Sequence, residues 1–397
     1  MRLRHDLHLA YCTNIHRGES WAEIFAALQR HTLAVRDRVS PGRPFAVGLR
    51  LGVAAARDLA DEAHLGEFRR WLDRQQAYVF TINGFPYGQF HGTRVKEQAY
   101  APDWTTRERL DYTNLLFDLL AELVPAGVEG SVSSVPVSFK GFKLDARALR
   151  AARENLWRCI EHIERVARRS GRALHLGLEP EPLCTLETTP EAVEFFHQLQ
   201  ADRPGDLRLR EHLGLNYDCC HLAVEFESPA EALERLHRAG IRLSKLHLSA
   251  ALKLQPNPAA RQALRAFADD TYLHQVIVRG LDGTLTRHAD LEPALALHNH
   301  LPPPPGEEWR VHFHVPLHAP PTDLFGTTAD HLLGALDWLA AHPGACRHLE
   351  METYTWELLP PELKSRSVVD QLVAEYQWTL GELAKRGLAE PARGNHG

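Results

Sequence analysis

Short apolar segments alternate with amphipathic segments along almost the whole chain. The apolar segments have the composition of buried strands, and they cover residues 8–15, 45–51, 77–85, 128–135, 173–178, 213–217, 242–248 and 348–352. Between them, apolar residues recur at helical spacing, as Trp21, Ile24, Phe25 and Leu28 do. The pattern predicts helices over residues 21–39, 58–74, 107–123, 145–169, from 189 onward, 229–239 and 368–386.

Repeated alternation of strand and helix predicts a parallel sheet that is covered by helices. Eight such units close naturally into a (β/α)₈ TIM barrel. A doubly wound open sheet is the alternative, but it requires a glycine-rich turn after the first strand, and none follows Ile15. We therefore expect one TIM-barrel domain over residues 1–386 and a disordered tail over residues 387–397.

A long insertion, at about residues 253–319, interrupts the pattern between the seventh and eighth strands. It contains a helical piece at 259–268 and a candidate hairpin around Asp282-Gly283. Insertions of this size in a barrel form the rim or lid of an active site. An arm that binds a second subunit of a homo-oligomer is an equal alternative.

Composition and charge narrow the function. The net charge of −6 gives no basic field, which argues against a nucleic-acid partner. No stretch approaches the roughly 20 apolar residues of a membrane span, and the first residues do not form a secretory signal, so we expect a cytoplasmic protein. The six cysteines are scattered, and the neighbours Cys219 and Cys220 are interpreted as packing residues.

Polar residues gather where the last four predicted strands end, which is where TIM barrels carry their catalytic groups. They are Glu179 and Glu181, Asp218 and His221, His247, and Glu350 and Glu352. Carboxylates that converge there repel one another unless a divalent cation joins them. Mixed Glu, Asp and His ligation suits Mn²⁺, Mg²⁺, Co²⁺, Fe²⁺ or Zn²⁺, so the pattern predicts a divalent-metal site.

The position of each acid along its strand selects the ligands. Glu179 follows the fifth strand directly, whereas Glu181 lies beyond a proline and is a candidate for substrate binding. Glu350 and Glu352 share one side of the eighth strand, and Glu352 lies nearer its end. The predicted metal ligands are therefore Glu179, Asp218, His247 and Glu352.

Further histidines and a loop add candidate substrate contacts. His221 follows Asp218 on one face of a turn, where it can bind a substrate hydroxyl or a second metal. His312 and His314 share a face at strand spacing, so His312 can line the pocket and His314 can add a metal ligand. Asn83 and His91 flank an aromatic-rich loop that can wall a small-molecule pocket.

These motifs resemble those of the xylose-isomerase-like TIM-barrel superfamily, which includes sugar isomerases and epimerases and the endonuclease IV type of DNA-repair enzyme. The matching features are LEPEP, the DxxH spacing, the histidine of the seventh strand and the glutamate of the eighth. More narrowly, AYCTNIHRGESWAEIF, FTINGFPYGQFHGTRVKEQAY, LEPEPLCTLETT and YDCCHLAVEFE resemble EboE-like proteins of bacterial ebo gene clusters.

The resemblance implies a metal-dependent isomerase or epimerase of a sugar-like or cyclitol-like compound or its phosphate. It implies that Glu179 and Glu352 act as acid and base and that His221 binds a substrate oxygen. The resemblance to EboE-like proteins implies a role in metabolite processing or traffic.

Two alternatives remain open at this point. One is a metal-dependent hydrolase or phosphodiesterase of the endonuclease IV type, although that pattern has an Asp where this chain has His312. The other is a non-catalytic metabolite-binding protein on the same scaffold. Metal content and a metal-dependent thermal shift distinguish the three.

Overall fold

A closed parallel barrel forms the centre of the computed structural model, which describes residues 1–92, 94–298, 306–360, 364 and 367–391. Its eight strands are hydrogen-bonded in the order β1-β13-β7-β6-β5-β4-β3-β2. A parallel bridge between Cys12 and Gly48 joins the two ends of this sheet. The strands are β1 (His8–Tyr11), β2 (Phe45–Arg50), β3 (Ala77–Asn83), β4 (Gly130–Ser134), β5 (Leu174–Leu178), β6 (Leu213–Asp218), β7 (Arg242–Leu248) and β13 (His348–Met351). All eight predicted strands are present, and the predicted (β/α)₈ barrel is confirmed.

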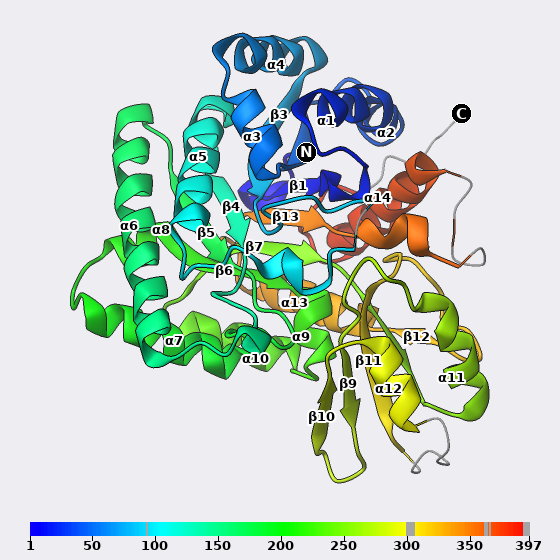
Figure 1. Cartoon of the computed structure of the whole chain (residues 1–397). Coiled ribbons are helices and arrows are strands. Elements are labelled where there is room, and N and C mark those ends of the chain that lie inside the picture. Colours follow the sequence, from blue (N-terminus) through cyan, green and yellow to red (C-terminus); the bar gives the residue numbers. More distant parts are fainter. Residues whose placement is uncertain (93, 299–305, 361–363, 365–366, 392–397) are drawn as a thin grey trace, which may run out of the picture.

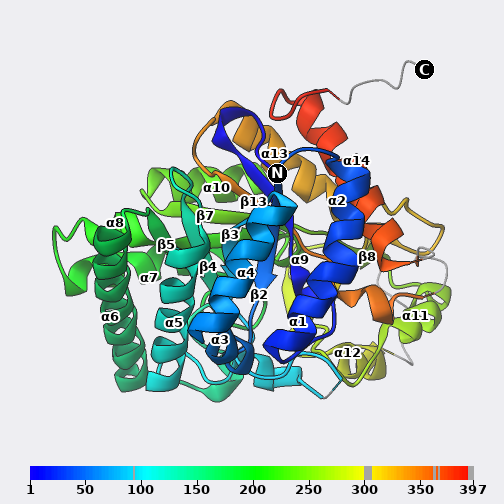
Figure 2. The ribbon, with the colours of Figure 1, turned by 90° about the horizontal axis from the view of Figure 1, so that it is seen from above.

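Helices surround the barrel and bury its outer face (Figures 1 and 2). They are α1 (Trp21–Ala27), α2 (Leu33–Val39), α3 (Val53–Leu59), α4 (Glu62–Gln75), α5 (Arg107–Leu123), α6 (Ala146–Ser170), α7 (Thr189–Asp202), α8 (Arg208–His212), α9 (Cys219–Val224), α10 (Pro229–Arg238), α13 (Ala329–Ala341) and α14 (Val368–Lys385). Neighbours such as α3, α5 and α6 contact one another in chain order around the sheet. In Figure 2 the helices α6, α5, α4 and α2 run side by side along one side of the barrel.

The helix predicted over residues 58–74 corresponds to α4, and only its first two residues belong to the preceding helix α3. The side chain of Asp61 accepts hydrogen bonds from the backbone of Ala63 and His64, so it caps the start of α4. An N-cap residue marks the start of a new helix even where the apolar spacing continues without a break. Hydrophobic spacing alone does not reveal such a start.

The insertion folds as a second, antiparallel sheet with the order β10-β9-β11-β8-β12 (Figure 1). Its elements are β8 (Ala251–Leu254), α11 (Pro258–Leu264), β9 (Val276–Arg279), β10 (Leu285–His288), α12 (Leu291–His298), β11 (Glu308–His314) and β12 (Gly326–Thr327). The predicted hairpin is present, and Gly283 takes a positive φ in its turn. The sheet extends beyond the predicted bounds of 253–319, because β8 continues the apolar run of β7 after only two residues.

Hydrogen bonds attach the insertion to loops that follow the barrel strands. The backbone N–H groups of Val95 and Lys96 donate to the carbonyl oxygen of Thr271. The Lys96 Nζ lies 2.6 Å from Asp290 Oδ2. These contacts fix the loop after β3 against the insertion, at the end of the barrel where the predicted site residues lie.

Among the residues that the structure describes, no helix is both long and apolar enough to cross a membrane. All six cysteines are buried and none forms a disulfide. Of the predicted tail at 387–397, residues 392–397 lie outside the described part of the chain.

Replacing Gly48 by Ala is expected to destabilise the protein by about 1–3 kcal/mol, because the new methyl group overfills the barrel interior. Its Cβ would lie 1.9 Å from Oε1 of Glu350 and 2.6 Å from the Tyr11 carbonyl oxygen. Gly381→Ala is the matched control, since no atom lies within 4 Å of its Cβ and a helical alanine is favoured. Urea unfolding of both variants tests this, and equal stabilities would contradict it.

Candidate metal centre and cavity

Four side chains from four neighbouring strands meet at the C-terminal end of the barrel. Glu179 follows β5, Asp218 ends β6, His247 lies on β7 and Glu352 follows β13. Each is buried, with no more than 4% of its surface exposed. One ligand atom from each lies within 4.8 Å of the others. The structure thus brings together all four residues that strand position selected.

The His247 imidazole lies at the centre of this group. Its Nδ1 is 3.0 Å from Glu179 Oε1, 3.0 Å from Glu352 Oε2 and 3.3 Å from Asp218 Oδ2. Burial opposes the charge on this ring, but the Glu352 and Glu179 carboxylates raise the pKa of His247 well above its ordinary value. A proton held among carboxylates occupies the position in which a cation is most stabilised.

Two carboxylate oxygens in this group fit a divalent cation. Glu179 Oε2 and Asp218 Oδ2 are buried and have no hydrogen-bond partner among the described residues. The other oxygen of Asp218 accepts from Ser249 Oγ at 2.7 Å and from the backbone N–H of His221 at 3.0 Å. Since leaving buried carboxylate oxygens unpaired is costly, a bound cation would satisfy them.

Three further histidines stand beside this group, and each makes a hydrogen bond through Nδ1. The Nδ1–H groups of His221, His312 and His314 donate to the Pro180 carbonyl, Gln275 Oε1 and the Glu352 carbonyl, at 2.9, 2.7 and 2.8 Å. In the neutral form of each ring Nε2 carries the lone pair, although the Asp218 and Glu181 carboxylates raise the pKa of His221 against the effect of burial. For His312 and His314 this atom is buried and without a partner among the described residues.

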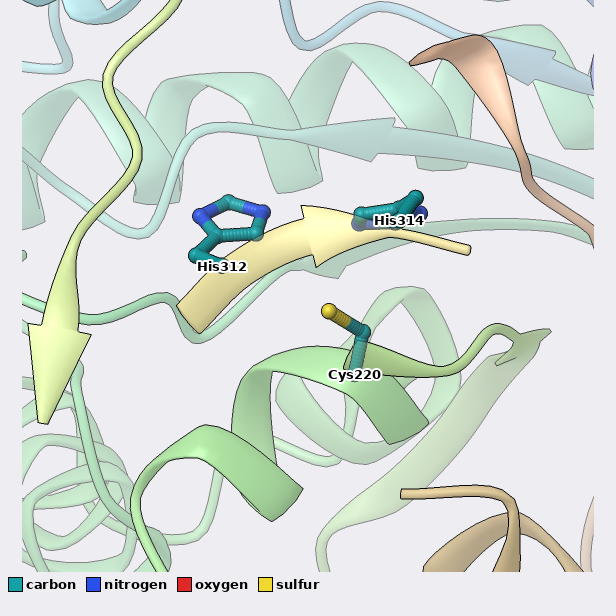
Figure 3. Close-up of side chains that lie close together, drawn as sticks. All are labelled: Cys220, His312 and His314. Atoms are coloured by element: carbon teal, nitrogen blue, oxygen red, sulfur yellow. The ribbon is translucent and has the colours of Figure 1, made fainter. Parts of the chain in front are cut away.

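A cysteine lies against two of these rings. Figure 3 shows Cys220 pointing from α9 toward β11, which carries His312 and His314. One ligand atom from each of the three lies within 4.8 Å of the others. Cys220 packs with Val224, Ala251 and Ile277, which agrees with the packing interpretation, and it also lies near these two imidazole rings.

A cavity of about 70 Å³ opens onto the candidate metal centre. Its polar lining includes the predicted residues Asn83, Glu179, Glu181, His221, His312 and Glu352. Aromatic side chains form much of the remaining wall, namely Phe85, Phe90, Tyr100, Tyr272 and Tyr354. Such a mixture of apolar wall and convergent polar groups is typical of a small-molecule site.

Glu181 is a cavity-lining acid with a raised pKa. Burial raises the pKa of Glu181 to about 7, against the opposing effect of His221. Its Oε1 accepts from the Tyr100 hydroxyl at 2.6 Å and lies 3.4 Å from Gln275 Nε2. Tyr100 and Gln275 were not predicted, because they come from the η4 turn (Lys96–Tyr100) and the insertion, far from any strand end.

His91 does not line the cavity, unlike the other predicted substrate contacts. Its Nε2 lies 2.7 Å from the Asn14 carbonyl, and its Nδ1 lies 3.3 Å from Glu19 Oε1. Both ring nitrogens are thus engaged in holding the loop after β3. We correct the predicted role of His91 to support of this loop.

A lysine and a second glutamate lie directly beneath the candidate ligands. The Lys245 Nζ pairs with Oε2 of Glu350, and both side chains are buried. Lys245 holds the pKa of Glu350 at about 2 although burial opposes ionisation. Lys245 could have been predicted from the alternation of side chains along a strand, since it lies two residues before His247 on the same face of β7.

Comparison with solved structures shows the fold that this chain shares with known proteins. A xylose isomerase-like TIM barrel protein from Mycobacterium smegmatis, in complex with magnesium, aligns with 96% of this chain and 97% of its own, at 15% identity and a TM-score of 0.53. An L-ribulose 3-epimerase aligns over 100% of both chains at 13% identity and a TM-score of 0.51. No model of a known protein family matches the chain, and no curated protein matches its sequence. At these identities the likeness establishes the xylose-isomerase-like barrel fold.

Proposed function

We propose that this protein is a metal-dependent isomerase or epimerase of a sugar-like or cyclitol-like compound. The observation that supports this proposal most is the pair Glu179 and Glu352, which line one cavity from strands separated by β6 and β7. Two carboxylates on different sides of a bound substrate can remove a proton from one face and return it to the other. The epimerase and the magnesium complex among the structural neighbours agree with this chemistry.

Three side chains that line the cavity have separate roles in the proposed reaction. Glu179 has two carboxylate oxygens, so one can accept a proton while the other, the unpartnered Oε2, binds the cation. Glu352 Oε1 receives the amide of Asn14 at 2.6 Å and that of Asn83 at 3.2 Å, which hold it in place. His221, with its Nδ1–H given to Pro180, offers Nε2 to a substrate hydroxyl.

A divalent cation bound by Glu179, Asp218, His247 and Glu352 would supply electrophilic polarisation of a substrate carbonyl. Aromatic side chains form much of the cavity wall, and a wall of this kind limits contact of the transferred proton with solvent. The resemblance to EboE-like proteins adds the proposal that the reaction belongs to metabolite processing or traffic in an ebo-type gene cluster. We propose further that the insertion at residues 251–327 serves as the rim of this site.

Solvent-deuterium exchange tests the proposed reaction. The Mn²⁺-loaded protein is incubated in D₂O with a panel of ketoses and keto-cyclitols, with and without phosphate groups, and followed by NMR. We expect deuterium at the carbon beside the carbonyl of at least one compound. A panel that shows binding without exchange would favour a metabolite-binding protein.

One observation favours a second candidate, a metal-dependent hydrolase or phosphodiesterase. His221 and His312 line the cavity, His314 lies beside Asp218 and His221, and Cys220 lies near His312 and His314. Imidazole and thiolate groups together favour zinc over magnesium. This set provides ligands for a second ion, which an isomerase with one metal does not need.

Metal content separates the two candidates. For the isomerase we expect one tightly bound Mn²⁺ or Mg²⁺ per chain and an unchanged metal content in His314→Ala. Two or more zinc ions per chain, with one lost in His314→Ala, would favour the hydrolase. Elemental analysis after dialysis measures this, and the exposed His64→Ala is the control.

A further inference from the structure

The candidate ligands rest on a second layer of side chains inside the barrel. Lys245 and Glu350 lie two residues before His247 and Glu352 on β7 and β13. Alternate residues of a strand point to the same side, so all four side chains enter the barrel interior. Lys245 is 1% exposed and Glu350 is fully buried. The proposed proton transfers use neither residue.

Glu350 joins the lower layer to the metal centre through one imidazole. Its Oε2 lies 2.8 Å from His247 Nε2, on the side of the ring opposite Glu179 and Glu352. An imidazole that donates Nε2–H to a carboxylate presents the Nδ1 lone pair on its other side. The same contact raises the basicity of that lone pair.

Residues of three other strands place the carboxylate of Glu350. Lys245 Nζ pairs with its Oε2 and lies 3.2 Å from Ser133 Oγ, so the lysine is itself held from the other side. Gly48 of β2 leaves the space for the carboxylate, since a Cβ there would lie 1.9 Å from Glu350 Oε1. Three strands thus contribute to the placement of one acid.

We propose that Lys245 and Glu350 form a positioning pair, in which Glu350 fixes the His247 tautomer that binds the divalent cation through Nδ1. Lys245 supplies the counter-charge, so Glu350 acts on His247 without adding net negative charge beneath three other carboxylates. This inference rests on the metal site of the proposed function, but not on the reaction performed there.

Removing the Glu350 charge is therefore expected to weaken metal binding without altering any candidate ligand. Outer hydrogen-bond partners of metal-binding histidines typically contribute 10–100-fold to metal affinity. We expect Glu350→Gln to bind Mn²⁺ 10–100-fold more weakly than wild type, in a competition titration against a fluorescent chelator. Glu129→Gln is the matched control, because it removes the ion pairs with Arg242 and Arg347 away from His247.

The tautomer provides a readout that a merely structural role would not change. In Zn²⁺-loaded, ¹⁵N-histidine-labelled protein, in which the cation would replace the proton on Nδ1, we expect the wild-type His247 signals to report an Nε2–H that is shielded from exchange. In Glu350→Gln this Nε2–H proton should exchange faster, while Glu129→Gln leaves its exchange unchanged. His247→Gln identifies the signals by their loss.

A double variant covers the case in which Glu350→Gln does not fold. Lys245→Met with Glu350→Leu replaces the pair by apolar groups of similar size, which buried ion pairs often tolerate. The double variant should fold and show the same loss of Mn²⁺ affinity. Wild-type Mn²⁺ affinity together with unchanged His247 signals, in either variant, overturns the proposal. Absence of deuterium exchange with intact Mn²⁺ binding would contradict the proposed reaction alone.

Discussion

Glu352→Gln should reduce turnover by about 10²–10⁴ on whichever panel compound exchanges deuterium, because it removes a proton-transfer group from the cavity. The glutamine keeps the side-chain shape and an oxygen for the amides of Asn14 and Asn83, so the barrel should remain folded. It also removes one carboxylate from the candidate metal centre, so Mn²⁺ should raise the melting temperature less than in wild type.

A nearby glutamate provides the control for this substitution. Glu357 lies in the turn after the same strand and forms an exposed ion pair with Arg17. Glu357→Gln should keep wild-type rates and the wild-type thermal response to Mn²⁺. Solvent-deuterium exchange and thermal unfolding, measured with and without Mn²⁺, follow both properties. Full exchange activity in Glu352→Gln would exclude the assigned role.

The barrel and the candidate ligands were predictable for one physical reason. A strand buried on both faces is a continuous apolar run, so a polar residue at its end is conspicuous. Glu179, Asp218, His247 and Glu352 each stand at such an end, and parallel strands bring their ends to one face of the barrel. At these four positions the sequence pattern alone therefore predicts where the barrel places the side chain.

The rest of the site depends on contacts that no local pattern encodes. Gln275 reaches His312 and Tyr100 from the insertion, and Tyr100 reaches Glu181 across 81 positions of sequence. The misassigned His91 is polar and lies near a strand end, yet Glu19 and the Asn14 carbonyl already hold it. Polar residues in loops have many available partners, and only the folded chain selects among them.

Glu375→Gln is expected to stabilise the protein at pH 8 by about 3 kcal/mol and to have little effect at pH 4. Burial raises the pKa of Glu375 from 4.5 to about 7. One pKa unit corresponds to about 1.4 kcal/mol. Ionisation of Glu375 in the folded protein therefore lowers the free energy of unfolding by about 3 kcal/mol. Its Oε1 accepts from Thr353 Oγ1 at 2.8 Å and from the Leu317 backbone at 3.2 Å, and glutamine retains this oxygen.

The direction of the pH dependence follows from the raised pKa. In the unfolded chain Glu375 ionises near pH 4.5, whereas in the folded protein it stays protonated to about pH 7. Its stabilising contribution is therefore complete below pH 4.5 and is lost as the pH rises through 7. Glutamine resembles the protonated acid at every pH, so the variant keeps the contribution that wild type loses. The difference between the two proteins should grow between pH 4.5 and 7 and then level off.

Urea unfolding across pH 4–8 measures this difference, because every other titrating group is common to both proteins. Glu382→Gln on the same helix is the control with the opposite sign. The contact with Lys385 holds the pKa of Glu382 below its ordinary value, so its removal should give no gain in stability as the pH rises. A Glu375→Gln curve parallel to wild type would show that Glu375 ionises normally in the folded protein. A growing gap would show that the acid beside Thr353, next to Glu352 in the chain, stays neutral until the pH passes about 7.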